Sequence, residues 1–334
     1  MKSEDVESTR RTLPSTEDVN PASIGIDEKS ARDIVRTMHD EDGAAWRALE
    51  PVGDVIAAVV DVVAETFRVG GRLIYVGAGT SGRLGILDAA ECPPTFGVDP
   101  DLVVGVIAGG EVALRRAVEG AEDDPEAGAR AVADLGVGRR DVVCGIAASG
   151  STPFVRGAIL ESRERGATTA LITSNTRLDD TVLLDAIDHC VTLAVGPEMI
   201  AGSTRMKSGT AAKMALNRIT TAAMIRHGKV HDNLMVDVVA TNAKLRRRAR
   251  HLVRRIGGVD EERATALLQE AGGSVKVALV VFAKGIGPSA ARKLLSRHDG
   301  HLRSALESAV EDASSEPSRR PSSGPGGGDP GKFP

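Results

Sequence analysis

The chain has 334 residues, enough for one large domain with appendages or for two domains. Hydrophobic residues make up 42% of it and aromatic residues only 2%, which predicts a core of alanine, valine, leucine and isoleucine, as in buried parallel strands covered by helices. The net charge of −4 excludes an overall basic field, so we expect no nucleic-acid partner.

The first predicted elements are an arm and two helices. Residues 1–22 are polar, which predicts a flexible N-terminal arm. Apolar residues then recur at helical spacing over 26–38 and over 44–67. We therefore expect two helices, the second of which ends at the glycine pair Gly70-Gly71.

The stretch from Leu73 to Gly82 predicts a strand, a turn and the start of a helix. Four apolar residues run into a turn with three glycines and two hydroxyl side chains, and helix-forming residues follow. Free backbone N–H groups at the helix start and the positive end of its dipole can hold a phosphate there. The hydroxyl groups of Thr80 and Ser81 add hydrogen-bond donors.

The same turn also matches the glycine pattern of dinucleotide-binding proteins, Gly77-x-Gly79-x-x-Gly82. That kind of site needs an acidic residue at the end of the second strand, about 20 residues further on, to bind a ribose hydroxyl. The second predicted strand, 102–107, ends in Ala-Gly-Gly, and the next acid, Glu111, lies at a predicted helix start. The pattern therefore favours a small phosphorylated ligand, and we expect no nicotinamide or flavin cofactor.

Strands and helices then alternate along the chain. Further strands are predicted at 141–147, 168–173 and 189–194, and a long helix at about 203–226. This alternation indicates an α/β fold with a doubly wound, five-stranded parallel sheet.

Three of the predicted strands end in segments rich in small hydroxyl residues, at 80–81, 149–152 and 174–176. In an open α/β sheet, ligands bind at the carboxyl ends of strands where the strand order switches. We therefore expect the three segments to converge on one crevice that binds an oxyanion. The alternative, that serine and threonine only cap the following helices, remains open for any single segment.

The C-terminal part of the chain is predicted to be helical. Residues 233–257 predict a connecting helix, whose basic cluster at 244–255 we interpret as a solvated face, and 258–312 predict a small bundle of short helices. The segment 313–334 is rich in serine, proline and glycine, which predicts a disordered tail. The sheet and its N-terminal helices then form one domain at 23–232.

Two glutamates are candidates for acid–base chemistry. Glu91 lies just before Pro93-Pro94, where we expect the helix to end, and a carboxyl at a helix C-terminus faces an unfavourable dipole, which suits a general acid. Glu122 lies in the break after the second strand, but spacing cannot choose between it and Glu119. For each glutamate alone, the alternative is a solvated loop carboxylate.

Cysteines and histidines form no competing site. The three cysteines and seven histidines have no metal-ligand spacing, and the odd number of cysteines argues against a disulfide framework, so we expect no metal. No apolar run is long enough to span a bilayer, and the first residues do not resemble a signal peptide. We therefore expect a cytoplasmic protein without a membrane partner.

Longer motifs add a resemblance to known families. The turn Gly77 to Gly82, the segment Ala147 to Gly150 and the five-strand order resemble the sugar isomerase (SIS) domain, which binds phosphosugars. Four further motifs resemble N-acetylmuramic acid 6-phosphate etherases, and they are Leu87 to Thr95, Val118 to Asp123, Gly202 to Thr210 and Asn233 to Asp237. The glucokinase regulatory protein shares these loops but carries two such domains, and this chain has room for one.

The resemblance implies that Glu91 is the proton donor and Glu122 the second catalytic residue, which settles the choice that spacing left open. It also implies a homodimer that cleaves the lactyl ether of its phosphosugar to N-acetylglucosamine 6-phosphate and D-lactate, without metal or cofactor, in peptidoglycan recycling. A C-terminal bundle with a ubiquitin-associated-like (UBA-like) fold is implied as well. Two alternatives share the sheet fold: a non-catalytic regulator that binds sugar phosphates, and an aldose–ketose isomerase.

For the phosphosugar we expect seven binding residues, namely Gly79, Thr80, Ser81, Ser149, Gly150, Ser151 and Thr152. Ser151 departs from the family, which commonly has arginine at this position, and Phe154 stands where tyrosine is common. Without that arginine, a positive charge is missing next to the expected ligand.

Overall fold

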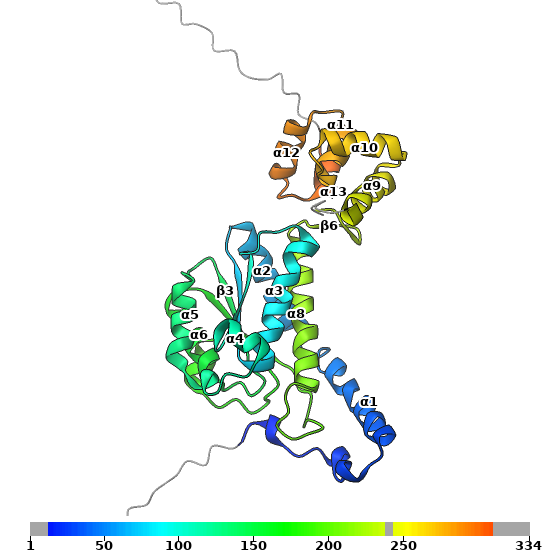
Figure 1. Ribbon diagram of the computed structural model, residues 1–334. Helices are drawn as coiled ribbons and strands as arrows, with labels where there is room; N and C mark the ends of the chain where they lie inside the picture. The colour runs from blue at the N-terminus through cyan, green and yellow to red at the C-terminus, as the bar shows by residue number, and fades with distance from the viewer. Residues whose placement is uncertain (1–12, 238–242, 310–334) are drawn as a thin grey trace, which may run out of the picture.

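The computed structural model describes residues 13–237 and 243–309, so most of the predicted arm and tail, 1–12 and 313–334, lies outside the described residues. Its centre is a five-stranded sheet in the order β2-β1-β3-β4-β5 with every pair parallel (Figure 1). The strands are β1 (Leu73–Gly77), β2 (Val103–Ile107), β3 (Val142–Ile146), β4 (Thr168–Thr173) and β5 (His189–Thr192). The predicted doubly wound parallel sheet is confirmed.

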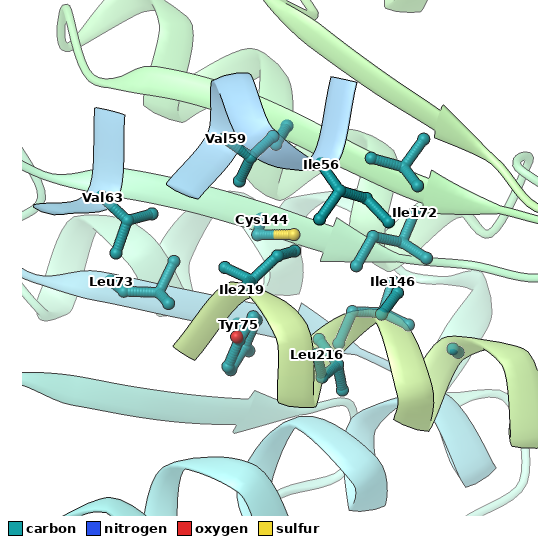
Figure 2. Packing of buried hydrophobic residues seen from close by; sticks show 14 of the residues in the cluster. Ile56, Val59, Val63, Leu73, Tyr75, Cys144, Ile146, Ile172, Leu216 and Ile219 are labelled. Atoms are coloured by element: carbon teal, nitrogen blue, oxygen red, sulfur yellow. The ribbon is translucent and has the colours of Figure 1, made fainter. Parts of the chain in front are cut away.

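Helices cover both faces of this sheet. One face packs against α2 (Gly53–Arg68), α3 (Gly79–Phe96) and α8 (Lys207–Arg226), and the other against α5 (Pro125–Asp134), α6 (Pro153–Glu164) and α7 (Thr181–Asp185). Figure 2 shows Ile56 of α2 and Ile219 of α8 packed over Cys144 of β3. Because side chains alternate along a strand, Val143 of β3 points into the opposite layer, against α5 and α6. A short helix, α4 (Gly110–Arg115), follows β2.

The first two helices begin several residues later than their apolar spacing predicts. They are α1 (Ala31–Arg47) and α2, in place of the expected 26–38 and 44–67. The hydroxyl of Ser30 accepts a hydrogen bond from the backbone N–H of Asp33 and caps the start of α1. Pro51 lies in the turn between the helices, where its missing N–H costs nothing.

Helix α3 does not end before its two prolines, as we expected. It continues through Pro93 and Pro94 to Phe96, and Gly97, in the left-handed conformation, donates a hydrogen bond to the carbonyl of Pro93. Both prolines lie in the last turn, where they lack the N–H groups that would donate to the carbonyls of Ala89 and Ala90, so the helix continues without these two hydrogen bonds. Glu91 is therefore inside the helix and not at its end.

The start of α8 is set by a buried carboxylate. Glu198, fully buried, accepts hydrogen bonds at 2.9 Å from the backbone N–H groups of both Lys207 and Ser208. This carboxylate takes the place of an N-cap side chain and adds a negative charge at the positive end of the helix dipole. The helix therefore begins at Lys207 and not at about 203.

The segment after α8 is a short hairpin where we expected a helix. Its strands are β6 (Val230–His231) and β7 (Leu234–Met235). Helix α9 (Ala243–Gly257) follows, and its Leu252 and Val253 are buried in the same core as the helices after it, so it belongs to the bundle. Those helices are α10 (Glu261–Glu270), α11 (Val275–Lys284), α12 (Pro288–Arg297) and α13 (Leu302–Glu307).

A membrane-spanning helix must be about 20 residues long and mostly apolar. No single helix in 13–237 or 243–309 is long and apolar enough to cross a bilayer. Helices α10 and α11 are long and apolar enough only when taken together, and this pair is bent by 105°. Leu267 of α10 and Val280 of α11 are fully buried in the bundle core.

Helices α5 and α6 touch through two glycines, so a larger residue at either position should destabilise the fold. A Cβ atom on Gly128 would lie 1.9 Å from the carbonyl oxygen of Phe154, and one on Gly157 would lie 1.9 Å from that of Pro125. We expect Gly157→Ala to push the helices apart and lower the free energy of unfolding by about 2 kcal/mol or more, measured by urea denaturation. Gly53→Ala is the matched control, because a Cβ atom there meets nothing within 4 Å. Equal stability of the two variants would contradict the expected steric contact.

Candidate active site

A crevice of about 430 Å³ lies at the carboxyl ends of β1 and β3. These two strands are neighbours at the point where the strand order reverses, which is where open α/β sheets bind ligands. Six of the seven predicted binding residues line it, namely Gly79, Thr80, Ser81, Ser149, Ser151 and Thr152. Gly150, the seventh, lies between two of the lining residues and has a φ of 71°.

The turn after β1 brings the start of α3 against the strand end. A Cβ atom on Gly77 would lie 2.6 Å from the backbone nitrogen of Gly82, so only glycine permits this close approach. Ala78, the N-cap residue of α3, offers no side-chain hydrogen bond to the helix. The first N–H groups of α3 are therefore not capped by its own N-cap side chain, and they start at the crevice.

The loop after β3 supplies a second helix start. Ser149 accepts hydrogen bonds from the backbone N–H and the hydroxyl of Ser151, and Thr152 precedes α6 without a side-chain cap. Two helix N-termini thus converge on one crevice, and none of its described lining residues is lysine or arginine. An anion here would be bound by backbone N–H groups, hydroxyl groups and helix dipoles.

The third hydroxyl-rich segment, after β4, does not line the crevice. Its Asn175 accepts hydrogen bonds at 3.0 Å from the backbone N–H and the hydroxyl of Ser15, and its own side-chain N–H group donates to the carbonyl of Ser149. It therefore ties the N-terminal segment to the loop after β3. Through this tie, Thr16 and Glu17 become lining residues of the crevice.

Residues 13–20, which we expected in a flexible arm, are thus docked on the sheet domain. Thr16 and Glu17 were not predicted as site residues, because their segment has no helix or strand periodicity in the sequence. The local signal was Asn20-Pro21, since the Asn20 side chain accepts the N–H of Ala22 and caps a short 3-10 turn.

The far end of the docked segment is held by a buried ion pair. Asn20 donates hydrogen bonds to the carboxylate of Glu41 (2.7 Å) and to the carbonyl of Pro197 (3.1 Å). Lys207, whose side chain is 2% exposed, donates to the same Glu41 carboxylate at 2.6 Å. The hydrogen bond from Lys207 holds the pKa of Glu41 below its ordinary value of 4.5.

Because Lys207 is buried, we expect Glu41→Gln to lower the free energy of unfolding by about 2 kcal/mol, measured by urea denaturation at pH 7. Glu65→Gln, which breaks the exposed pair with Arg68, should leave it nearly unchanged. The contribution of Glu41 is complete above its ordinary pKa and is lost as the pH falls through the lowered value, so Glu41→Gln should also reduce the loss of stability in acid. Equal effects of the two substitutions would contradict the importance of the buried lysine.

The two predicted catalytic glutamates lie in different places. Glu122, in the 3-10 turn η4 (Ala121–Asp123), lines the crevice and also an adjoining pocket of about 180 Å³, whereas Glu119 lines only the pocket. Glu91 is exposed on α3, twelve residues after Gly79, which is about 18 Å along the helix axis. Within one chain, Glu91 is not among the lining residues of the crevice.

The adjoining pocket differs from the crevice in charge. Arg83 and Arg116 line it, together with Glu119 and Glu122. The guanidinium of Arg83 is positioned by a hydrogen bond from its Nε to the carbonyl of Leu114, at 3.2 Å. An elongated ligand with an anion at each end would meet helix N-termini in the crevice and arginines in the pocket.

Metal and thiol chemistry find no support in the described side chains. In residues 13–237 and 243–309 there is no group of three or more histidine, cysteine, aspartate or glutamate side chains placed to hold a metal. Cys92 and Cys144 are free and buried, and burial raises the pKa of each thiol to about 12. Neither thiol is ionised near neutral pH, so neither is a ready nucleophile.

Comparison with known proteins identifies the family. The model of the glucokinase regulatory protein N-terminal SIS domain matches residues 54–162. The N-acetylmuramic acid 6-phosphate etherase of Rhodopirellula baltica is 49% identical over 87% of this chain and 95% of that protein. The chain belongs to the N-acetylmuramic acid 6-phosphate etherase family. The etherase of Aliivibrio fischeri is 48% identical over 87% of this chain and 96% of its own.

Solved structures are more distant than these etherases. Phosphoheptose isomerase GmhA from Neisseria gonorrhoeae is 18% identical, with a TM-score of 0.41, over 58% of this chain and 97% of its own. The family resemblance expected from the motifs is confirmed by the sequence identity to the etherases and does not rest on this structural similarity.

Proposed function

We propose that the crevice is the active site of a carbon–oxygen lyase that cleaves the D-lactyl ether of N-acetylmuramic acid 6-phosphate. The products are N-acetylglucosamine 6-phosphate and D-lactate. Membership of the etherase family supports this reaction, and so does the position of Glu122 in the structure. Glu122 lines a crevice whose other walls include two helix N-termini suited to a phosphate.

The chemistry of the substrate explains what the site must supply. A simple ether resists hydrolysis, but in the open-chain aldehyde the carbonyl acidifies the proton at C2. A base removes that proton, the C3–oxygen bond breaks as the C2–C3 double bond forms, and an acid protonates the departing lactate. Water then adds across the double bond. Each acid–base contribution is typically worth about 100- to 10,000-fold in rate.

In the proposed binding mode the phosphate lies at the starts of α3 and α6, among Thr80, Ser81 and the serines of the loop after β3. The sugar then extends past Glu122, which takes the C2 proton. The carboxylate of the lactyl group faces Arg83 and Arg116 in the adjoining pocket. This orientation is supported by the position of Glu122, which lines both cavities.

Glu91 requires a second subunit in this scheme. It lies on the exposed face of α3 near Leu87, which is 47% exposed and one turn earlier. A large apolar side chain at this position is suited to an interface between subunits. We infer a homodimer in which Glu91 of one subunit reaches the crevice of its partner and protonates lactate.

We also propose a cytoplasmic location and a role in peptidoglycan recycling.

The proposed reaction is tested by incubating the protein with N-acetylmuramic acid 6-phosphate and assaying enzymatically for D-lactate. An etherase releases lactate, an isomerase forms a ketose without lactate, and a regulator binds the sugar without turnover. Absence of lactate with a folded, ligand-binding protein would refute the proposed reaction.

A further inference from the structure

Thr16 has a feature that the fold does not explain. It lines the crevice and is only 3% exposed, yet its hydroxyl has no hydrogen-bond partner among the described residues. Buried hydroxyl groups in folded proteins nearly always have a partner, because an unpaired one loses its hydrogen bonds to water. Such a group beside a cavity is a candidate for binding a ligand.

The backbone around Thr16 is held in place from both sides. The preceding residue, Ser15, is bound to Asn175, and the carbonyl of Thr16 itself accepts a hydrogen bond from the N–H of Gly202 at 3.3 Å. Asn175 also donates to the carbonyl of Ser149, in the loop that begins α6. Thr16 is therefore anchored next to the end of the crevice that we assign to the phosphate, and its hydroxyl proton, which no described residue accepts, can turn about the Cβ–Oγ1 bond.

We propose that Thr16 is a substrate-binding residue whose hydroxyl donates a hydrogen bond to the phosphate of the phosphosugar. This inference rests on the proposed function, since it names a further ligand contact in the same crevice. None of the described lining residues is lysine or arginine, so each hydroxyl donor represents a sizeable share of the binding. The docked N-terminal segment is thereby a wall of the site.

If Thr16 binds the phosphate, replacing it should weaken phosphosugar binding without lowering the stability of the ligand-free protein. Thr16→Val removes only the unpaired hydroxyl, so the melting temperature without ligand should stay the same or rise. The affinity for N-acetylglucosamine 6-phosphate, measured by titration calorimetry, should fall about 10-fold, and the KM for the etherase substrate should rise by a similar factor. Thr16→Ser, which keeps a hydroxyl, should bind nearly as well as the unchanged protein.

Thr169→Val is the matched control. Thr169 is fully buried at the start of β4, and its hydroxyl already donates to the carbonyl of Ala186 at 2.5 Å. This variant should lower the melting temperature and leave phosphosugar affinity unchanged. Unchanged affinity in Thr16→Val would overturn the proposal, whatever happens to its melting temperature.

The test of the Thr16 contact does not depend on whether the protein catalyses the proposed reaction. Calorimetry with N-acetylglucosamine 6-phosphate needs no turnover, so weaker binding by Thr16→Val supports the contact even if the unchanged protein releases no lactate. Inorganic phosphate serves as a second probe. A similar loss of affinity for both probes supports a contact with the phosphate, and an unchanged affinity for inorganic phosphate would overturn that assignment.

Discussion

Glu122→Gln lowers kcat for lactate release by about 100- to 10,000-fold, with little change in phosphosugar affinity. We expect this result because the amide keeps the shape of the side chain but cannot accept the C2 proton. Glu122 lines the crevice beside the helix starts that would hold the phosphate, and these do not depend on its charge. The measurement is a lactate assay at saturating substrate, with calorimetric titration of N-acetylglucosamine 6-phosphate as the binding readout.

Glu119→Gln is the control for this prediction. Glu119 lies three residues earlier in the same loop and lines only the adjoining pocket. It should retain most of the rate, because no proton transfer is assigned to it. Full activity of Glu122→Gln, or an equal loss in both variants, would remove Glu122 from its assigned role.

The sheet and the binding loops were predictable because they rest on local patterns. The apolar run ending in Gly77 and the glycine spacing up to Gly82 are short-range signals, and the structure places them as a strand and a helix start. The same holds for the loop at 149–152, since Pro153 is suited to the first turn of α6. The strand order then brings both loops to one crevice.

Two of the wrong predictions, the flexible arm and the start of α8, came from contacts with residues outside the predicted element. Nothing near Ser15 in the sequence indicates that Asn175, 160 residues later, holds it against the sheet domain. Similarly, Glu198 fixes the start of α8 from outside that helix. Tertiary hydrogen bonds of this kind override local propensity, and a single sequence carries no signal for them.

The charge of the crevice is a second feature, which the sequence predicts only in part. Ser151, which we predicted as a binding residue at a position where the family commonly has arginine, lines it, and none of the described lining residues is lysine or arginine. The arginines lie instead in the adjoining pocket, beyond Glu122. The phosphate end of the site thus depends on neutral donors and helix dipoles, which makes contacts such as that of Thr16 more important.

Mixing two inactive variants is expected to restore activity. Glu91→Gln alone should lose lactate release by about 100-fold or more, because the leaving group lacks its acid. If each crevice combines Glu122 of one subunit with Glu91 of its partner, a mixed dimer of Glu91→Gln and Glu122→Gln chains has one intact site and one doubly substituted site. Random exchange of subunits should then recover about a quarter of the original activity, measured by lactate assay after joint refolding.

The same experiment decides between sites within one chain and sites shared by two. Were Glu91 to act in its own chain, no mixed dimer would contain an intact site, and the mixture would stay as inactive as its parts. Leu87→Asp in both chains is the control, since a charge on the exposed face of α3 should oppose the contact and prevent recovery. A mixture without recovery, formed from chains that demonstrably exchange, would leave Glu91 without access to the crevice and require a different acid.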